Sequence, residues 1–330
     1  MSVDLATRVL KADPAAITAA ARMLARGGLV AFPTETVYGL GADARNGPAV
    51  ARLFAAKGRP QFNPLIAHVP DLATAKRLAR FGAMAERLAA ALWPGPLTLV
   101  LEKVRGCPVS ELATAGLDTI AVRIPEHPVA QSLLAAFAAP VVAPSANRSG
   151  HISPTSAAHV VADLEGRIDL VVDGGATQVG IESTIVSCVG EKPVLLRPGG
   201  LARDRIEAEL ALELAAPPIA ATAGPIAPGM LERHYAPRAR LRLDAREVEP
   251  GEALLAFGPA LVPGADRAIA VRNLSPAGDL IEAAANLFSD LRALDAAGAP
   301  GIAVMRIPRD GLGEAINDRL ARAAAPPENS

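Results

Sequence analysis

Short apolar runs alternate with segments of helical periodicity between Asp13 and Arg197. Apolar runs of this length are typical of buried strands, and apolar residues recurring every three or four positions predict helices. Strands are expected at residues 29–32, 64–69, 97–101, 119–123, 141–143, 170–172, 185–187 and 194–196. Helices are expected at residues 14–26, 48–57, 71–81, 83–92, 128–137 and 155–164. This alternation predicts an α/β layer structure with a mixed sheet.

The first expected strand ends in an unusually polar segment. Its apolar residues run into Pro33, which cannot donate a ladder hydrogen bond. The polar stretch Thr34-Glu35-Thr36 follows, and then the pair Gly39-x-Gly41. We expect residues 34–41 to form a loop whose backbone approaches another group closely.

The apolar pattern is lost after Leu214 and returns beyond Pro237. The intervening prolines suit an extended linker. A second α/β unit is expected from a strand at 253–257, a helix at 278–297, a strand at 301–305 and a helix at 314–322. The sequence thus predicts a large domain at 1–214, a linker at 215–238 and a small domain at 239–330. The last residues of the small domain, 325–330, are expected to be disordered.

Composition narrows the class of protein. Hydrophobic residues make up 51% of the chain, which permits a large core, and the net charge of −1 disfavours electrostatic binding of nucleic acid by the whole surface. Cys107 and Cys188 have no metal-type spacing, which favours a reducing compartment over a disulfide scaffold. The N-terminus has no apolar signal segment and the longest apolar runs are too short to span a bilayer, so we expect a cytoplasmic protein without a membrane part.

Cationic residues follow or end several expected elements. Lys57 and Arg59 lie at the end of a helix, while Arg123 and Arg197 each end an apolar strand. Ligands of open α/β sheets bind at strand ends, and a guanidinium presents a fork to phosphate or carboxylate, so these four residues could line one anionic cleft. The alternative is that Lys57 and Arg59 complement the helix dipole and that the two strand-end arginines are surface residues.

Polar loop residues supply further candidates, each with an ordinary structural alternative. Ser145 and Asn147 follow a buried strand and could offer hydroxyl and amide groups to a ligand, or form an ordinary turn. Ser153 could cap the next helix, and Asp173 could hold a cation or cap a turn. His68 is expected at a loop edge rather than as a metal ligand. The sequence lacks Walker-type and Gly-x-Gly-x-x-Gly phosphate loops.

Several stretches together resemble the L-threonylcarbamoyladenylate synthase family with its YrdC-like catalytic domain. The stretches are Pro33 to Gly41, Lys57-Gly58-Arg59, Asn63-Pro64-Leu65, Trp93 to Thr98, Ala115 to Pro125, Ala143 to Asn147, Glu182 to Ile185 and Leu196 to Gly199. Pro228-Gly229-Met230 and His234 to Pro237 resemble the linker of the two-domain form, which carries a Rossmann-like C-terminal domain. The resemblance implies a twisted mixed sheet with flanking helices, plus that smaller domain.

The resemblance also implies an activity and the residues that serve it. The expected reaction joins L-threonine, bicarbonate and ATP into threonylcarbamoyl-AMP and releases pyrophosphate, with Mg²⁺ bound to the ATP phosphates and not by protein side chains. A partner transferase then modifies tRNA next to the anticodon, so tRNA is an indirect partner. The implied ATP ligands are Arg59, Asn63, Thr119, Ser145, Asn147, Ser153, Arg197, His234 and Tyr235. The implied threonine ligands are Thr36, His68, Arg123, Ala143 and Ser183, with Lys57 and Arg59 as the cations that assist the reaction.

Two other functions stay open at this stage. A YrdC-type module could bind RNA and act in ribosome maturation, although the net charge and the low aromatic content of 3% disfavour it. Carbamoyl-adenylate chemistry on another acceptor, as in hydrogenase maturation, is disfavoured because the accessory domains are missing. The Pro/Gly-rich linker is expected to act as a lid that keeps water from a labile mixed anhydride.

Overall fold

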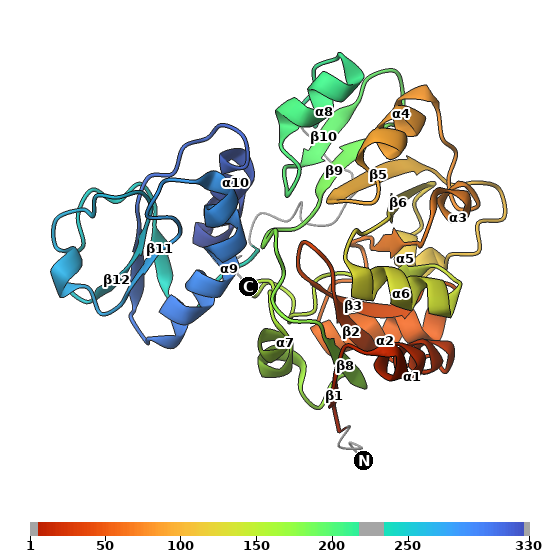
Figure 1. Cartoon of the computed structure of the whole chain (residues 1–330), viewed down its shortest axis with the longest axis horizontal. Helices are drawn as coiled ribbons and strands as arrows, with labels where there is room; N and C mark the ends of the chain where they lie inside the picture. The colour runs from red at the N-terminus through yellow and green to blue at the C-terminus, as the bar shows by residue number, and fades with distance from the viewer. Residues whose placement is uncertain (1–5, 218–233, 327–330) are drawn as a thin grey trace.

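The computed structural model describes residues 6–217 and 234–326. These residues form a larger part, built on a long mixed sheet, and a smaller part with its own parallel sheet (Figure 1). Most of the expected linker, including Pro228-Gly229-Met230, and the last four residues of the expected tail lie outside the described residues. The domain boundaries predicted above therefore stay predictions.

Ten strands form the large sheet within the described residues. Their order is β1 (Arg8–Lys11), β8 (Leu170–Asp173), β2 (Val30–Pro33), β3 (Tyr38–Asp43), β7 (Val141–Val142), β4 (Ile66–His68), β6 (Thr119–Arg123), β5 (Leu97–Glu102), β9 (Thr184–Ser187) and β10 (Val194–Arg197). The sheet contains both parallel pairs, such as β4–β6, and antiparallel pairs, such as β5–β6. The mixed α/β sheet expected from the alternating pattern is confirmed.

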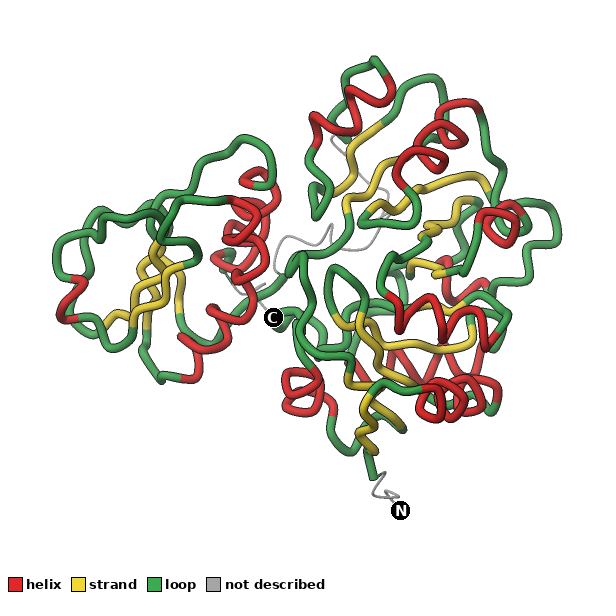
Figure 2. The backbone as a smooth tube through the Cα atoms, viewed as in Figure 1, coloured by secondary structure: helices red, strands yellow, loops and turns green. Residues whose placement is uncertain are grey.

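Helices flank this sheet (Figures 1 and 2). Their apolar residues are buried in the cores that they share with it. They are α1 (Pro14–Ala25), α2 (Gly47–Lys57), α3 (Leu72–Lys76), α4 (Ala83–Leu92), α5 (Glu111–Thr114), α6 (Pro128–Phe137), α7 (Ala157–Leu164) and α8 (Arg203–Leu210). Asp13 caps α1 by accepting a hydrogen bond from the backbone N–H of Ala16, and Gly58 ends α2 in a left-handed conformation. Helix α3 is shorter than the expected 71–81.

The segment expected as a loop after Pro33 is a β-hairpin, which corrects the sequence-based expectation. Strand β3 pairs antiparallel with β2 on one side and with β7 on the other. The Gly-x-Gly pair is a packing requirement of this strand: a Cβ at Gly41 would lie 2.9 Å from the Phe32 ring, and one at Gly39 would lie 3.1 Å from the Cβ of Ala143. Only residues 34–37 turn the chain.

The smaller part holds a parallel sheet of four strands within the described residues. Its order is β11 (Arg240–Arg242), β14 (Gly301–Val304), β12 (Glu252–Ala256) and β13 (Val271–Asn273), with a short turn η1 (Ala265–Arg267) and helices α9 (Leu280–Ala296) and α10 (Gly313–Ala324). Both helices lie between this sheet and the larger part (Figure 1). The second α/β unit expected from the sequence is therefore present, as a parallel sheet with two helices on one side.

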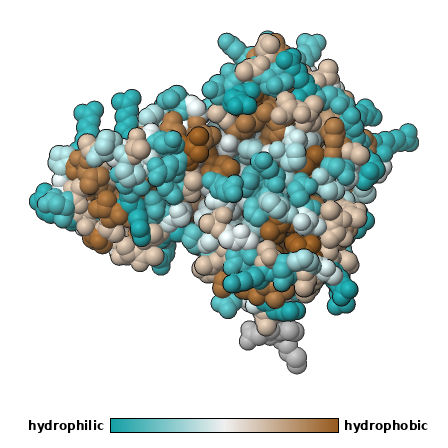
Figure 3. Space-filling model, viewed as in Figure 1, coloured by the Kyte–Doolittle hydropathy of each residue, from teal (hydrophilic) through white to brown (hydrophobic). Residues whose placement is uncertain are grey.

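The two parts pack directly against each other. The core of the smaller part, formed by Phe288 and its neighbours, also includes Val37, Ile152 and Ile181 of the larger part. On the face drawn in Figure 3, apolar residues form separate patches among hydrophilic ones. Within the described residues, none of the helices is both long and apolar enough to cross a bilayer.

Candidate active site

The hairpin turn between β2 and β3 is fixed by its own hydroxyl groups. Thr34 donates through Oγ1 to the carbonyl of Val37 at 2.7 Å, and its Oγ1 lies 2.8 Å from Oγ1 of Thr36. All three residues are buried and line one pocket. The predicted threonine contact Thr36 is therefore held in place by its neighbour Thr34, which sequence reasoning did not single out.

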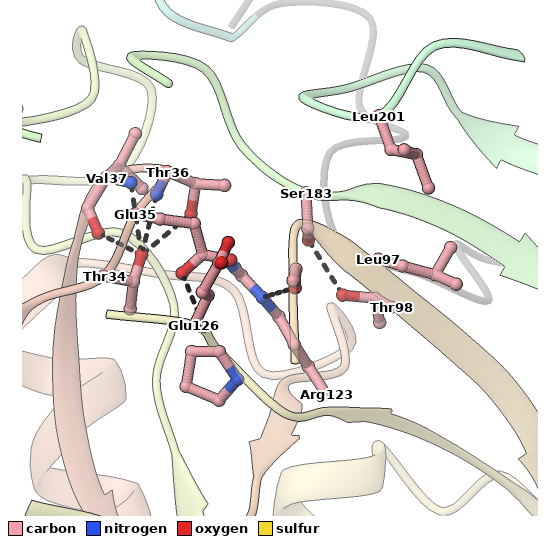
Figure 4. A network of polar contacts seen from close by, with 12 residues as sticks. Thr34, Glu35, Thr36, Val37, Leu97, Thr98, Arg123, Glu126, Ser183 and Leu201 are labelled. Carbon is pink, nitrogen blue, oxygen red and sulfur yellow. Dashed lines mark hydrogen bonds and ion pairs between the residues drawn. The ribbon is translucent and has the colours of Figure 1, made fainter. Parts of the chain in front are cut away.

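A buried ion pair lies beside this turn (Figure 4). Arg123 donates through Nη2 to Oε1 of Glu35 at 2.6 Å, and the two side chains are 4% and 6% exposed. The second carboxylate oxygen of Glu35 accepts the backbone N–H of Glu126 at 3.1 Å, and Nε of Arg123 donates to the carbonyl of Gly95 at 3.3 Å. Glu35 thus orients Arg123, a role that the sequence did not reveal although Glu35 lies within the quoted motif.

Two further predicted threonine contacts are also held by the larger part alone. Oγ of Ser183 lies 2.8 Å from Oγ1 of the fully buried Thr98 (Figure 4). His68 lies with a ring nitrogen 3.2 Å from the carbonyl of Ile66, and burial together with the charge of Arg123 lowers the pKa of His68 to about 3. His68 is therefore neutral at physiological pH.

One pocket brings together most of the predicted site residues. Ten of them line it: Thr36, Arg59, His68, Arg123, Ala143, Ser145, Ser183, Arg197, His234 and Tyr235. They come from strand ends in the middle of the sheet, from the loops that follow, and from the segment that enters the smaller part. The expectation that distant arginines converge on one cleft is thus met by the geometry.

Lys57 lies behind the pocket rather than in its wall. It is buried, and its Nζ donates to the carbonyls of Ser145 and Asn147, each at 2.5 Å. Burial and the nearby charge of Arg59 lower the pKa of Lys57 well below its usual value. Lys57 therefore holds the loop that presents Ser145, and its predicted direct part in the reaction has no support from its position.

Several predicted ATP ligands have buried polar atoms without partners in the described part of the chain; of these residues Arg59 and His234 line the pocket, whereas Asn63 and Asn147 are not among its lining residues. Nε of Arg59, both amide atoms of Asn63, Oδ1 of Asn147 and Nδ1 of His234 have no hydrogen-bond partner among the described residues. Burial lowers the pKa of Arg59 to about 10, and burial with the surrounding cations lowers the pKa of His234 to about 3. Because an unpaired buried polar group is unfavourable, such atoms are available to pair with water or with a polar ligand.

Ser153 does not cap a helix as the structural alternative proposed; Ser156 caps α7 instead. Oγ of Ser153 donates to Oε1 of Glu182 at 2.5 Å, and Glu182 lines the pocket. Burial by itself would raise the pKa of Glu182, but the positive charges of Arg319 and Arg197 outweigh it and lower this pKa to about 2. Sequence reasoning missed Glu182 as an individual site residue.

Two predicted candidates lie away from this pocket. Thr119 begins β6 whereas Arg123 ends it, and Thr119 lines a separate surface hollow with Lys103 and Glu111. Asp173 accepts the backbone N–H of Gly175 at 3.0 Å, as a turn cap does. Among the described residues, no group of three or more His, Cys, Asp or Glu side chains is arranged to hold a metal ion. The binding role predicted for Thr119 stays a prediction.

Comparison with known proteins agrees with this architecture. A family model for Sua5, YciO and YrdC proteins, described as "Telomere recombination", matches residues 22–199. A second model, "Threonylcarbamoyl-AMP synthase, C-terminal domain", matches residues 201–325. The crystal structure of Escherichia coli YciO, 23% identical with a TM-score of 0.53, covers 59% of this chain and shares the fold of the larger part. The larger part is thus a YrdC-type α/β domain.

Full-length relatives define the form of the family. The threonylcarbamoyl-AMP synthase of Bacillus subtilis is 40% identical over 98% of this chain and 96% of its own length, and that of Pyrococcus abyssi is 42% identical over 93% and 94%. The crystal structure of P. abyssi Sua5 complexed with L-threonine has a TM-score of 0.86 at 39% identity and covers 97% of both chains. The chain belongs to the Sua5/YciO/YrdC family, in the two-domain form with the threonylcarbamoyl-AMP synthase C-terminal domain.

Proposed function

We infer that this protein is a threonylcarbamoyl-AMP synthase, an enzyme that joins L-threonine, bicarbonate and ATP and releases pyrophosphate. Relatives of this name match the chain over nearly its full length, and one related structure contains L-threonine. The observation that carries the inference is the pocket itself, whose lining combines the oriented Arg123 with Arg59, Arg197 and several hydroxyl groups.

The threonine side of the pocket comprises Thr36, His68, Arg123, Ala143 and Ser183. Its guanidinium suits the carboxylate of an amino acid, and its hydroxyl groups can bind the amine and the side-chain hydroxyl. A site built for a hydroxyl rejects valine strongly, because buried polar groups lose their partner when the hydroxyl is absent. Since Nη2 of Arg123 already holds Glu35, a carboxylate would be met by the rest of the guanidinium or would draw Nη2 away from Glu35.

The nucleotide side comprises Arg59, Asn63, Ser145, Asn147, Ser153, Arg197, His234 and Tyr235. Its unpaired atoms on Arg59, Asn63, Asn147 and His234 suit the phosphates, ribose and base of ATP. Arg197 donates to the backbone carbonyl of Ser183 at 2.7 Å, so it lies where the two sides meet. The reacting phosphate and the threonine amine would therefore come together near Ser183.

Mg²⁺ is proposed to enter with ATP. The carboxylate that lines the pocket, Glu182, is already engaged by Ser153 and Arg319, so the donor set suits phosphate-bound Mg²⁺ better than a protein-held ion. When bound, the ion would neutralise phosphate charge. The protein would hold it only indirectly, through Arg59 and Arg197 on the phosphates.

The chemistry needs an uncharged threonine amine, which attacks the bicarbonate carbon to form an N–C bond and a carbamate, while a C–O bond breaks and water leaves. The carbamate oxygen then displaces pyrophosphate from the α-phosphorus of ATP. Such a displacement gives the protein little covalent work, and positioning with neutralisation of charge supplies most of the rate.

Transfer of the product to tRNA by a partner transferase and a cytoplasmic location are part of the same proposal. The test is pyrophosphate release from ATP with and without threonine and bicarbonate, with serine and valine as competing substrates. Release that depends on threonine and bicarbonate supports the proposal. Release without threonine, or tight salt-sensitive RNA binding in place of catalysis, would contradict it.

A further inference from the structure

Arg319 of α10 reaches from the smaller part to Glu182, which lines the pocket. Its side chain is fully buried, although it lies on a helix whose outer face is polar. Nε donates to Oε2 of Glu182 at 2.8 Å, Nη2 donates to the carbonyl of Pro198 at 3.0 Å, and Nη1 pairs with Asp318 at 2.6 Å. A buried arginine with this many partners fixes the position of each of them.

The same guanidinium also lies over the ring of Tyr235, with its carbon 5.1 Å from the ring centroid. Tyr235 lines the pocket, stacks on Phe288 of α9 and has a left-handed backbone with φ of 63°. A non-glycine residue keeps this conformation only where surrounding contacts hold it. Arg319 and Phe288 supply those contacts, so the smaller part sets the position of a pocket residue from the connecting segment.

A second arginine of the smaller part holds the partner of Glu182. Arg292 of α9 donates through Nη2 to the carbonyl of Ile152, contacts the carbonyl of Ser153 at 3.4 Å and pairs with Asp163 at 2.7 Å. The two partners of the Ser153–Glu182 hydrogen bond are therefore each held by a helix of the smaller part: Ser153 by Arg292 of α9, and Glu182 by Arg319 of α10. Both helices face the larger part in Figure 1.

We propose that Arg319 is a positioning residue of the ATP site: it neutralises Glu182 and locks Glu182 and Tyr235 in the geometry that accepts the triphosphate. The proposal rests on the nucleotide side assigned under the proposed function. Glu182 carries a full negative charge next to the place where polyphosphate would bind. Without Arg319, that charge would repel ATP and would remain buried with one cation fewer.

The role predicts a specific pattern of kinetic constants. Arg319→Met should raise the KM for ATP about tenfold or more, because losing one partner of a buried ion pair is strongly unfavourable, while the KM for threonine changes much less. The double variant Arg319→Met/Glu182→Gln removes both charges and should recover most of the ATP affinity. Arg319→Lys keeps the charge without the fork and should fall between Met and the native residue.

Arg203→Met is the matched control. Arg203 forms an ion pair of 2.6 Å with Glu314 of the same helix α10, also joining the two parts, but neither residue lines the pocket. Its loss should leave the KM for ATP within about twofold of native, because a half-exposed pair contributes little. Thermal unfolding of every variant separates loss of folding from loss of positioning.

The outcomes are distinct. An unchanged KM for ATP in Arg319→Met, or an equal rise in Arg203→Met, would overturn the positioning role. If the double variant has the same raised KM for ATP as the single variant, charge neutralisation is overturned. If Arg319→Met alone fails to fold, the double variant can still be measured, because a neutral pair is expected to fold. Failure of the native protein to release pyrophosphate would instead count against the proposed function.

Discussion

The two sides of the pocket differ in how completely the protein has arranged them. On the threonine side, Arg123 is held by Glu35 and Gly95, and Ser183 is held by Thr98, all within the larger part. On the nucleotide side, Arg59, Asn63 and His234 keep buried atoms without partners among the described residues, and Tyr235 depends on Arg319 of the smaller part. The proposed threonine side is thus already arranged by the protein, whereas the proposed nucleotide side keeps buried polar atoms with which ATP could pair.

This difference predicts that the affinities for threonine and for ATP depend on different parts of the protein. If the proposed threonine side binds its substrate through groups that are already fixed, discrimination against close analogues is expected from its geometry. Unpaired buried groups on the nucleotide side each cost about 1–3 kcal/mol, and ATP can recover that cost on binding. Threonine affinity should therefore respond to changes inside the larger part, and ATP affinity to changes where the two parts meet.

Removing Arg123 should have the largest effect. Arg123→Ala deletes the expected carboxylate ligand and leaves Glu35 buried with only its backbone partner, a loss of about 3–5 kcal/mol for a broken buried pair. We expect the KM for threonine to rise at least about a hundredfold and the KM for ATP far less. Steady-state pyrophosphate release at varied threonine and ATP measures both constants. Equal losses of both affinities would contradict the division into two sides.

Gly180→Ala tests the dependence of the nucleotide side on docking of the smaller part. Gly180 has a φ of +76°, and a Cβ there would lie 2.4 Å from the carbonyl oxygen of Ala284 in α9. The helix must move, so we expect the KM for ATP to rise about tenfold, since small misplacements are costly in active sites. Gly190→Ala is the control, because Gly190 also has a positive φ, of +90°, but no atom within 4 Å of its Cβ. Similar kinetics for the two variants would refute the docking argument.

The buried His68 predicts a pH dependence of stability. Its pKa is lowered from 6.5 to about 3 in the folded protein, so the unfolded chain binds a proton there at a higher pH than the native state does. The stability is fully present above pH 6.5 and is lost as the pH falls from 6.5 toward 3, by at most about 1.4 kcal/mol per pH unit from this residue. The free energy of unfolding, measured with denaturant across this pH range, should change less steeply with pH in His68→Gln than in the native protein. An identical pH dependence in the two proteins would show that His68 is not buried in its neutral form.

Thr98→Val should have the smallest effect and act on threonine alone. The substitution keeps the shape but removes the hydroxyl partner of Ser183, an interaction of about 1 kcal/mol, so the KM for threonine should rise about fivefold. Thr98→Ser keeps the hydroxyl group and serves as the control. A change in the KM for ATP as large as that for threonine would place Ser183 on both sides of the pocket.

Strongly periodic segments could be predicted from the sequence, and segments defined by distant neighbours could not. Helix α6 and strand β6 lie at the predicted residues because each carries a local apolar pattern and clear end signals. Strand β3 was expected as a loop because glycines weaken strands. Its stability comes from partners on both sides, β2 and β7, and β7 lies about a hundred residues away.

The motif residues of the site were predictable, but the residues that orient them were not. Arg123 and Ser183 stand in recognisable motifs, whereas Glu35, Glu182 and Arg319 act through contacts between distant segments. Arg319 did leave a signal: it occupies the buried stripe of α10 beside Ile316 and Leu320. A charge at such a position requires a buried partner, although the sequence does not say which one.

The position of β1 at the edge of the large sheet bears on how the chain is made. Its only neighbour in the described residues is β8, and the contact between Thr7 and Ile168 spans 161 positions. At about 5–20 residues per second, ribosomal synthesis makes β8 on the order of ten seconds after β1. Helix α1 and hairpin β2–β3 can form during that interval, so the amino-terminal edge of the sheet closes late, after the strands at its centre have been made.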